Sequence, residues 1–457
     1  MKKAHMAVDG VSLSKKVLVF CRRTKRFREI RENDHLRWSA EGTMENYKRS
    51  SVTCIGEDRI NNLPEDLVDS ILERVPFEDA VRTSIISKTW RYRWTEIRAL
   101  VFDKTFSNKF AKNEAFGHNE FIKIINQVLT LHKGHILKFH LHIPNMSVDS
   151  FQEVDQWMLL LSRNGVRELI LTSSNQRYEL PSYVFYCLEL TKLELENCFF
   201  KPPLEFEGFL NLEKLLLKDI DFGANLCGTK MNLPQLKTLS LYSCTNVYNF
   251  NIKATKLRNL TVIACPDAML ATLLSNLTKI RFFYIDAQFL KMFTAENIPK
   301  WFPHPVNSLR HLWFGKFQFG DLDQLHGVLC LLRNSPNLKT LTMNLEMEPQ
   351  ADIGPASSIL KSPNSLDYKL CRLKTVEIRY LEGSIPELLF IKLLLAHSPS
   401  LQKFTIKPSR ASNVQKRLEI AMKIMQFPRA STKAKMFYFG SLYYPFMQHA
   451  NLSIAKG

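Results

Sequence analysis

Apolar residues recur along most of this chain in the frame L-x-x-L-x-L, in which other apolar residues replace leucine at some positions. The alternation inside the frame is typical of a β-strand with one buried face. Successive frames begin 20 to 35 residues apart, which leaves room for a loop or a helix between strands. The frame begins at Ile136, Val166, Leu190, Leu212, Leu236, Leu257, Leu277, Leu309, Leu338, Leu373 and Leu401. The pattern therefore predicts a repeat array of parallel strands.

Two of the later repeats carry a helix before their strand. Apolar residues follow helical spacing at 322–332 and at 388–395, and a Ser-Pro pair follows each stretch. The segments 331–338 and 394–401 match each other, so we interpret them as two copies of one unit. A period of about 20–29 residues is that of a leucine-rich repeat. We therefore expect an α/β solenoid with parallel strands on its concave side and helices or loops outside.

Three of the nine cysteines support this frame. Cys198, Cys244 and Cys265 each lie eight residues after a frame leucine, where a small side chain packs in the turn after the strand. The number of cysteines is odd and no pair has C-x-x-C spacing, so neither a disulfide framework nor a zinc knuckle is indicated. We expect reduced cysteines that fill the core.

A helical module precedes the repeats at residues 58–103. Pro64 suits the first turn of a helix, and Glu65 and Asp66 complement the positive end of its dipole. Two further short helices are predicted, from about Glu78 and through Trp90 and Trp94. The first helix carries an apolar face formed by Leu63, Leu67, Ile71 and Val75. A module of under about 50 residues rarely sustains its own core, so leftover apolar surface is expected to meet a partner.

The order of residues in this module resembles an F-box of the plant type. The matching residues are Asp58-Arg59-Ile60, Leu63-Pro64-Glu65-Asp66-Leu67, Ile71-Leu72, Val75-Pro76, Asp79 to Ser84, Ser87-Lys88, Trp90-Arg91 and Trp94. The resemblance implies docking onto an Skp-type adaptor and, through it, onto the cullin of an SCF ubiquitin ligase. It assigns adaptor binding to Leu63 and Pro64, supported by Leu67, Ile71, Val81 and Trp90. The alternative is a helical subdomain packed only against its own chain.

The last repeats resemble the FBD domain at the end of plant F-box/leucine-rich-repeat proteins. The resemblance rests on Leu373 to Ile378, Gly383, Glu387-Leu388, Ser398-Pro399, Gln402-Lys403, Phe427 to Ser431 and a strand predicted at 435–439. The expected domain order is a flexible basic arm at 1–57, the F-box at 58–103, a connecting helical segment at 104–135, the solenoid at 136–365, FBD-like repeats at 366–440 and a tail at 441–457.

Composition and charge narrow the possible functions. The chain has 457 residues, of which 45% are hydrophobic, and a net charge of +18; a disordered protein is excluded. Residues 1–50 hold 13 basic and 6 acidic residues, which indicates a flexible arm, with nuclear import or nucleic-acid contact as the functional alternative. Glycine-rich nucleotide motifs are absent, and no apolar run approaches the roughly 18 residues that span a bilayer. We expect a soluble protein of the nucleus or cytoplasm.

The displayed strand positions offer a candidate surface for an unknown substrate protein. Successive repeats present Tyr242, Ile263 and Phe283 after the third apolar residue, and the next repeat adds Trp313 beside Arg281 and His311. Aromatic side chains with arginine at the centre of a concave surface have the composition of an interface hot spot. The alternative is that a neighbouring loop or the tail covers these side chains.

The sequence predicts no catalytic residue, metal site or cofactor. It contains neither G-x-S-x-G nor HExxH. His140 and His142 share one strand face, but no acidic residue is close enough in the sequence to complete a metal site, so we expect them to face solvent. RNA binding is disfavoured, because acidic residues interrupt the basic residues of the frame at Glu168, Glu194, Glu196 and Glu377.

These observations together predict the substrate-recognition subunit of an SCF-type ubiquitin ligase. The chain would act as a non-catalytic adaptor, with one surface for the Skp-type adaptor and another for the substrate protein. The alternative is a leucine-rich-repeat binding or inhibitor module that joins no ligase.

Overall fold

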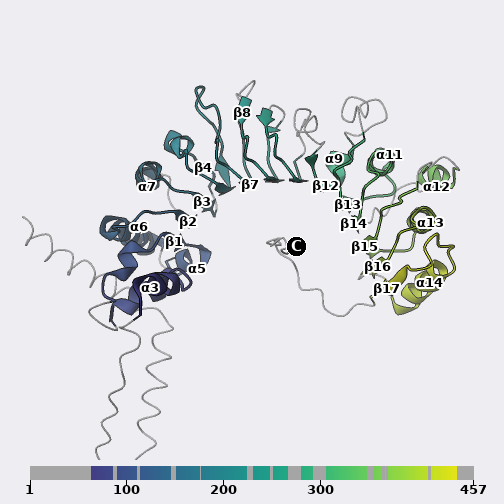
Figure 1. Cartoon of the computed structure of the whole chain (residues 1–457), viewed down its shortest axis with the longest axis horizontal. Coiled ribbons are helices and arrows are strands. Elements are labelled where there is room, and N and C mark those ends of the chain that lie inside the picture. The colour runs from purple at the N-terminus through teal and green to yellow at the C-terminus, as the bar shows by residue number, and fades with distance from the viewer. Residues whose placement is uncertain are drawn as a thin grey trace, which may run out of the picture. The chain divides into compact units, whose positions relative to one another are not determined.

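The structure is a computed structural model, and it describes residues 63–85, 90–110, 114–145, 151–174, 176–223, 230–247, 251–265, 279–291, 305–346, 354–362, 366, 369–409 and 413–439. The chain divides into two compact units, Met1–Leu212 and Glu213–Gly457. Both units are built on parallel strands (Figure 1). The arm predicted at 1–57 and the tail predicted at 441–457 lie outside the described residues.

Two helices open the first unit, and a proline precedes each. They are α3 (Glu65–Leu72), after Pro64, and α4 (Phe77–Arg82), after Pro76. Both carry two acidic residues in the first turn, where the helix dipole is positive. Two 3₁₀ turns follow, η1 (Thr83–Ile85) and η2 (Arg93–Glu96). The third helix predicted through Trp90 and Trp94 is therefore only a 3₁₀ turn around Trp94 in the described residues.

Four parallel strands of the first unit lie side by side in chain order. They are β1 (Ala99–Phe102), β2 (Lys138–Ile143), β3 (Glu168–Ser173) and β5 (Lys192–Glu196). Their connections contain α5 (Lys104–Ser107), α6 (Glu114–Leu131), α7 (Phe151–Arg163) and the 3₁₀ helix η4 (Ser182–Tyr186). The short strands β4 (Tyr178–Glu179) and β6 (Cys198–Phe199) pair separately. The helical segment expected at 104–135 is the crossover from β1 to β2.

The sheet begins earlier than the sequence analysis predicts. β1 pairs with β2, with Leu100 opposite Phe139, although the repeats were expected to begin at residue 136. Ile97, Leu100 and Phe102 are buried and themselves fit the L-x-x-L-x-L frame. The range 58–103 assigned to the F-box therefore contains the first strand of the repeats, which ties the helical module directly to the sheet.

Nine parallel strands of the second unit also lie side by side in chain order. They are β7 (Lys214–Lys218), β9 (Thr238–Tyr242), β11 (Asn259–Ile263), β12 (Phe282–Asp286), β13 (His311–Phe317), β14 (Thr340–Leu345), β15 (Thr375–Leu381), β16 (Lys403–Pro408) and β17 (Lys435–Tyr438). A separate pair joins β8 (Lys230–Asn232) to β10 (Asn251–Lys253). The helices α9 (Ala287–Leu290), α11 (Leu322–Arg333), α12 (Gly354–Lys361), α13 (Ile385–His397) and α14 (Val414–Met425) lie on one side of this sheet (Figure 1).

The frame residues form the core, as predicted. In β9, Leu239 and Leu241 are fully buried, because alternate residues of a strand face the same side. Cys198, Cys244 and Cys265 are buried free thiols, as predicted. Cys244 and Cys265 lie in the turns after β9 and β11, whereas Cys198 begins the short strand β6. The Cys244 thiol donates a hydrogen bond to the carbonyl oxygen of Leu217, on the neighbouring strand β7, with a sulfur to oxygen distance of 3.5 Å.

The predicted register is wrong at β12. Phe283 pairs with Leu260 and is only 1% exposed, whereas the sequence analysis placed it on the displayed surface. The frame of this repeat begins at the buried Ile280, three residues after Leu277. Apolar residues occupy both alternating sets of positions in this segment. Only the pairing of β12 with its neighbouring strands decides which set faces the core.

The last repeats show why Glu387 lies at the start of α13. Its buried carboxylate accepts hydrogen bonds from the backbone N–H groups of Glu382, Gly383 and Ser384, at 2.6–3.1 Å. This capping box satisfies N–H groups at the start of the helix. Gly383 has φ +82°, a conformation that favours glycine. The strand predicted at 435–439 is present as β17.

Candidate functional site

An apolar patch remains exposed on α3. Leu67 is 52% exposed and Ile71 is 43% exposed, and they lie one helical turn apart. The other side of the helix packs against the protein through Val68 and Leu72, which are buried. Pro64 is exposed as well and Leu63 is half-buried. We call Leu63, Pro64, Leu67 and Ile71 the α3 patch. All four were assigned to adaptor binding from the sequence.

Two other residues assigned to adaptor binding lie in the core. Val81 is fully buried and Trp90 is 4% exposed, so the supporting role assigned to them from the sequence is exerted from the core and not by direct contact with a partner. The module is too small to form a core of its own, and its inner faces pack against the first strand instead. Phe77 of α4 contacts Phe102 of β1 edge to face, with ring centroids 5.3 Å apart. Val81 and Trp90 therefore stabilise the helices that carry the patch.

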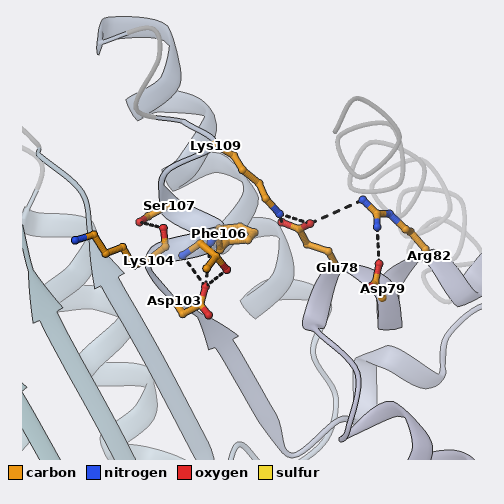
Figure 2. A network of polar contacts seen from close by, with 9 residues as sticks. Glu78, Asp79, Arg82, Asp103, Lys104, Phe106, Ser107 and Lys109 are labelled. Carbon is orange, nitrogen blue, oxygen red and sulfur yellow. Dashed lines mark hydrogen bonds and ion pairs between the residues drawn. The ribbon is translucent and has the colours of Figure 1, made fainter. Parts of the chain in front are cut away.

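Charged side chains also anchor the module to the start of the sheet. Figure 2 shows Lys109, in the turn after α5, reaching Glu78 of α4, with its ammonium 2.5 Å from both carboxylate oxygens. Arg82 forms ion pairs with Glu78 at 3.9 Å and with Asp79 at 2.5 Å. Asp103 caps α5 by accepting hydrogen bonds from backbone N–H groups. The α3 patch is therefore carried by a module fixed to unit 1 by aromatic contacts and ion pairs.

The second candidate surface is the face of the unit 2 sheet opposite its helices, which we call the display face. At its centre Tyr284 and Trp313, opposite each other on β12 and β13, stack with centroids 4.5 Å apart. The guanidinium of Arg379 lies over the Trp313 ring, 5.3 Å from its centroid. Burial, with Tyr242 and Asp286 nearby, raises the pKa of Tyr284 to about 12, so the phenol stays neutral at physiological pH.

An ion-pair network continues this cluster across β15 and β16. The carboxylate of Glu377 lies 2.8 Å from Arg379 Nε and 2.7 Å from Lys407 Nζ. Burial alone would raise the pKa of Glu377, but the hydrogen bonds from these two cations hold it below its ordinary value. The network fixes Arg379 over Trp313, so the cluster is preorganised.

Replacing Glu377 with glutamine is expected to lower the free energy of unfolding by about 1 kcal/mol at pH 7. The folded-state pKa of Glu377 lies below the unfolded value of 4.5, so its contribution is complete above that value and is lost as the pH falls through the folded-state pKa. Urea unfolding at neutral and at acidic pH measures this change. A difference that stays constant down to the lowest pH would contradict the ion-pair assignment. Glu419→Gln, on the exposed side of α14, is the control.

The structure places only some of the other predicted substrate-contact residues next to one another. Tyr242 and Ile263 pair across β9 and β11 and are half-buried. Arg281 and His311 are exposed. Partial desolvation of the His311 ring by neighbouring side chains, together with the positive charges of Lys339 and Arg310, lowers the pKa of His311. Trp313 is half-buried in the same column as Tyr284. Tyr284, Arg379 and Glu377 were not assigned to this surface from the sequence. The slipped frame at 277 hid Tyr284, and Arg379 and Glu377 lie on β15, two strands beyond Trp313.

His142 does not face solvent as predicted. It is buried, with Nδ1 2.7 Å from Thr172 Oγ1 and Nε2 2.9 Å from Ser174 Oγ. Burial lowers the pKa of His142 and of His140. Both ring nitrogens of His142 thus have protein partners. The described part of the chain contains no group of three or more potential metal ligands. Among the helices it contains, none is long and apolar enough to cross a bilayer.

Comparison with known proteins agrees with both halves of this architecture. The family profile described as At1g61320/AtMIF1, LRR domain, matches residues 128–430, and the F-box domain profile matches residues 60–99. The F-box/FBD/LRR-repeat protein At1g13570 of Arabidopsis thaliana is 28% identical over 420 residues, which cover 83% of this chain and 98% of that protein. The Arabidopsis F-box/FBD/LRR-repeat protein At2g04230 is 32% identical over 228 residues, 47% of this chain and 49% of that protein. With an F-box at its start and leucine-rich repeats over most of its length, the chain belongs to the plant F-box/FBD/leucine-rich-repeat family.

Proposed function

We propose that this chain is the substrate-recognition subunit of an SCF-type ubiquitin ligase. An F-box combined with leucine-rich repeats makes a protein-interaction adaptor. The exposed α3 patch, on a module anchored to the first repeat strand, is the observation that carries the proposal. In this proposal an Skp-type adaptor covers the patch and links the chain to a cullin.

The display face is our candidate for holding the target protein. Trp313, Tyr284 and Arg379 combine rigid aromatic area with a cation, which is the composition of interface hot spots. Partner proteins perform the ubiquitin transfer, and this chain contributes proximity. A target bound beside the charged ligase presents its lysines at a high effective concentration.

A leucine-rich-repeat binding or inhibitor module that joins no ligase is the rival function. Co-purification of the full chain with a recombinant Skp-type adaptor separates the two. The ligase function requires a complex that is lost when Leu63 and Pro64 are both replaced by alanine. Absence of any complex with the wild-type chain would favour the rival.

We further propose that the chain acts in the nucleus or cytoplasm. The support is the basic run at 22–28, a composition typical of nuclear import signals. Microscopy of the tagged chain with and without residues 1–50 tests this. Unchanged distribution after the deletion would leave the basic run without a role in import.

A further inference from the structure

Six basic residues form one column at the edge of unit 2 where its parallel strands begin. They are Lys237, Arg258, Arg281, Arg310, Lys339 and Lys374, each directly before one of six adjacent strands from β9 to β15. Backbone hydrogen bonds join neighbours in the column: the N–H of Arg258 donates to the carbonyl oxygen of Lys237, and the pattern continues to Lys374 with N to O distances of 2.7–2.9 Å. We call this column the basic ladder.

The basic ladder is long and has no acidic neighbour in the sequence. Adjacent strands lie about 4.8 Å apart, so the six positions cover about 24 Å. No Asp or Glu lies within two residues of any of them, and further basic residues lie two positions earlier in three repeats, at Lys256, Lys279 and Arg372. Four ladder side chains are exposed and two are half-buried. Such a column concentrates positive potential along one edge.

Little of this charge is neutralised within the described residues. Lys237, at one end of the ladder, forms an ion pair with Glu213, with Nζ 2.6 Å from Oε1. Arg310 Nη1 donates to the carbonyl oxygens of Asn307 and Asn337, at 2.8 and 3.3 Å, which positions the guanidinium without cancelling its charge. In the described part of the chain, no acidic side chain forms an ion pair with the other four, Arg258, Arg281, Lys339 and Lys374.

We propose that the basic ladder binds an acidic segment of a partner protein, a stretch rich in Asp and Glu. An extended segment rises roughly 3.3 Å per residue, so about seven residues match the ladder. The second, third and fourth positions are arginines, whose guanidinium groups donate paired hydrogen bonds to carboxylates. Neither end of this chain has surplus acidic charge to fill the ladder, because residues 1–50 are net basic and residues 441–457 contain no Asp or Glu.

A protein segment fits the ladder better than single-stranded nucleic acid does. Nucleic-acid grooves of that kind combine cations with aromatic faces on which bases stack. The aromatic rings nearest the ladder already contact one another: the centroids of Phe282 and His311 lie 6.4 Å apart, and Trp313 stacks on Tyr284 with Arg379 over its ring. Glutamates interrupt the basic residues at other positions of the frame, but no acidic residue interrupts this column. Binding of RNA is therefore measured alongside binding of the acidic peptide.

The test measures how tightly a labelled peptide of about eight alternating Glu and Ser residues binds to the purified full chain. Fluorescence anisotropy at about 0.05 M salt reports the binding. The ladder variant carries Arg258→Gln, Arg281→Gln and Lys339→Gln. The control variant removes the same charge from exposed positions on α13 and α14, by Lys392→Gln, Lys416→Gln and Lys423→Gln. We expect the ladder variant to bind about tenfold more weakly and the control less than about twofold.

Equal weakening in both variants, or no binding by the wild-type chain, would overturn the proposal. Tighter, ladder-dependent binding of an RNA oligonucleotide of the same charge would overturn it in favour of nucleic acid. As a statement about the recruited target, the inference rests on the proposed ligase function. The ladder variant is expected to keep its complex with the Skp-type adaptor. Loss of peptide binding therefore tests the ladder, and loss of the adaptor complex tests the ligase function.

Discussion

Replacing Leu67 and Ile71 together with aspartate is expected to weaken binding of the Skp-type adaptor by about a thousandfold. Both side chains are exposed in the free chain and would be buried in the complex. Truncating a central apolar contact costs about 2 kcal/mol or more, and two such losses correspond to about three orders of magnitude in Kd. Aspartate adds the penalty of burying a charge. Titration calorimetry with the purified adaptor measures the loss.

The chain offers a matched control on α14. Leu418 is 55% exposed and Met422 is 58% exposed, and they are also four residues apart on one helix. Replacing both with aspartate makes the same chemical change at a site outside the F-box. Adaptor binding should be retained there. If the α3 variant keeps full affinity while the protein stays folded, the adaptor contact does not involve this patch, and the ligase proposal loses its main support.

Replacing Phe102 with alanine is expected to destabilise the junction between the F-box helices and the first strand by about 3–5 kcal/mol. Phe102 is fully buried, and its ring contacts those of Phe77, Phe106 and Phe139 with centroids 5.2–5.9 Å apart. Its removal leaves a cavity where α4, α5 and β2 meet. The expected result is faster hydrogen exchange of the amides in α4 and β1.

Hydrogen exchange suits this variant because a chain of two compact units need not unfold in one transition. Tyr186→Ala is the control in the same unit, since that side chain is 57% exposed and little buried area is lost. Adaptor affinity should fall in the Phe102 variant as the helices that carry the α3 patch loosen. Unchanged exchange in α4 would show that the helical module is stable without this aromatic cluster.

Periodicity predicted the parts of the fold that depend on local alternation. The L-x-x-L-x-L frame located β2, β3, β5, β7, β9, β11 and β13 to β16, and it placed β12 in the wrong register. It did not predict the short strands β4, β6, β8 and β10, which pair outside the main sheet. Helical spacing in residues 63–75 located α3 and its exposed residues Leu67 and Ile71, because that spacing is visible without knowledge of any neighbour. On the display face, the sequence singled out Trp313, Tyr242 and Ile263 as candidate contacts, whereas it did not single out Tyr284 and Arg379.

The sequence by itself determined that strands, turns and an apolar helical face exist, since each follows from residues a few positions apart. Only the tertiary structure decided which apolar side chains are buried. Val81 and Trp90 became core because the first repeat strand lies under the helices, and Phe283 became core because β12 pairs with Leu260 opposite it. Columns such as the basic ladder arise from residues more than twenty positions apart that strand pairing sets side by side, and that pairing depends on packing along the whole sheet.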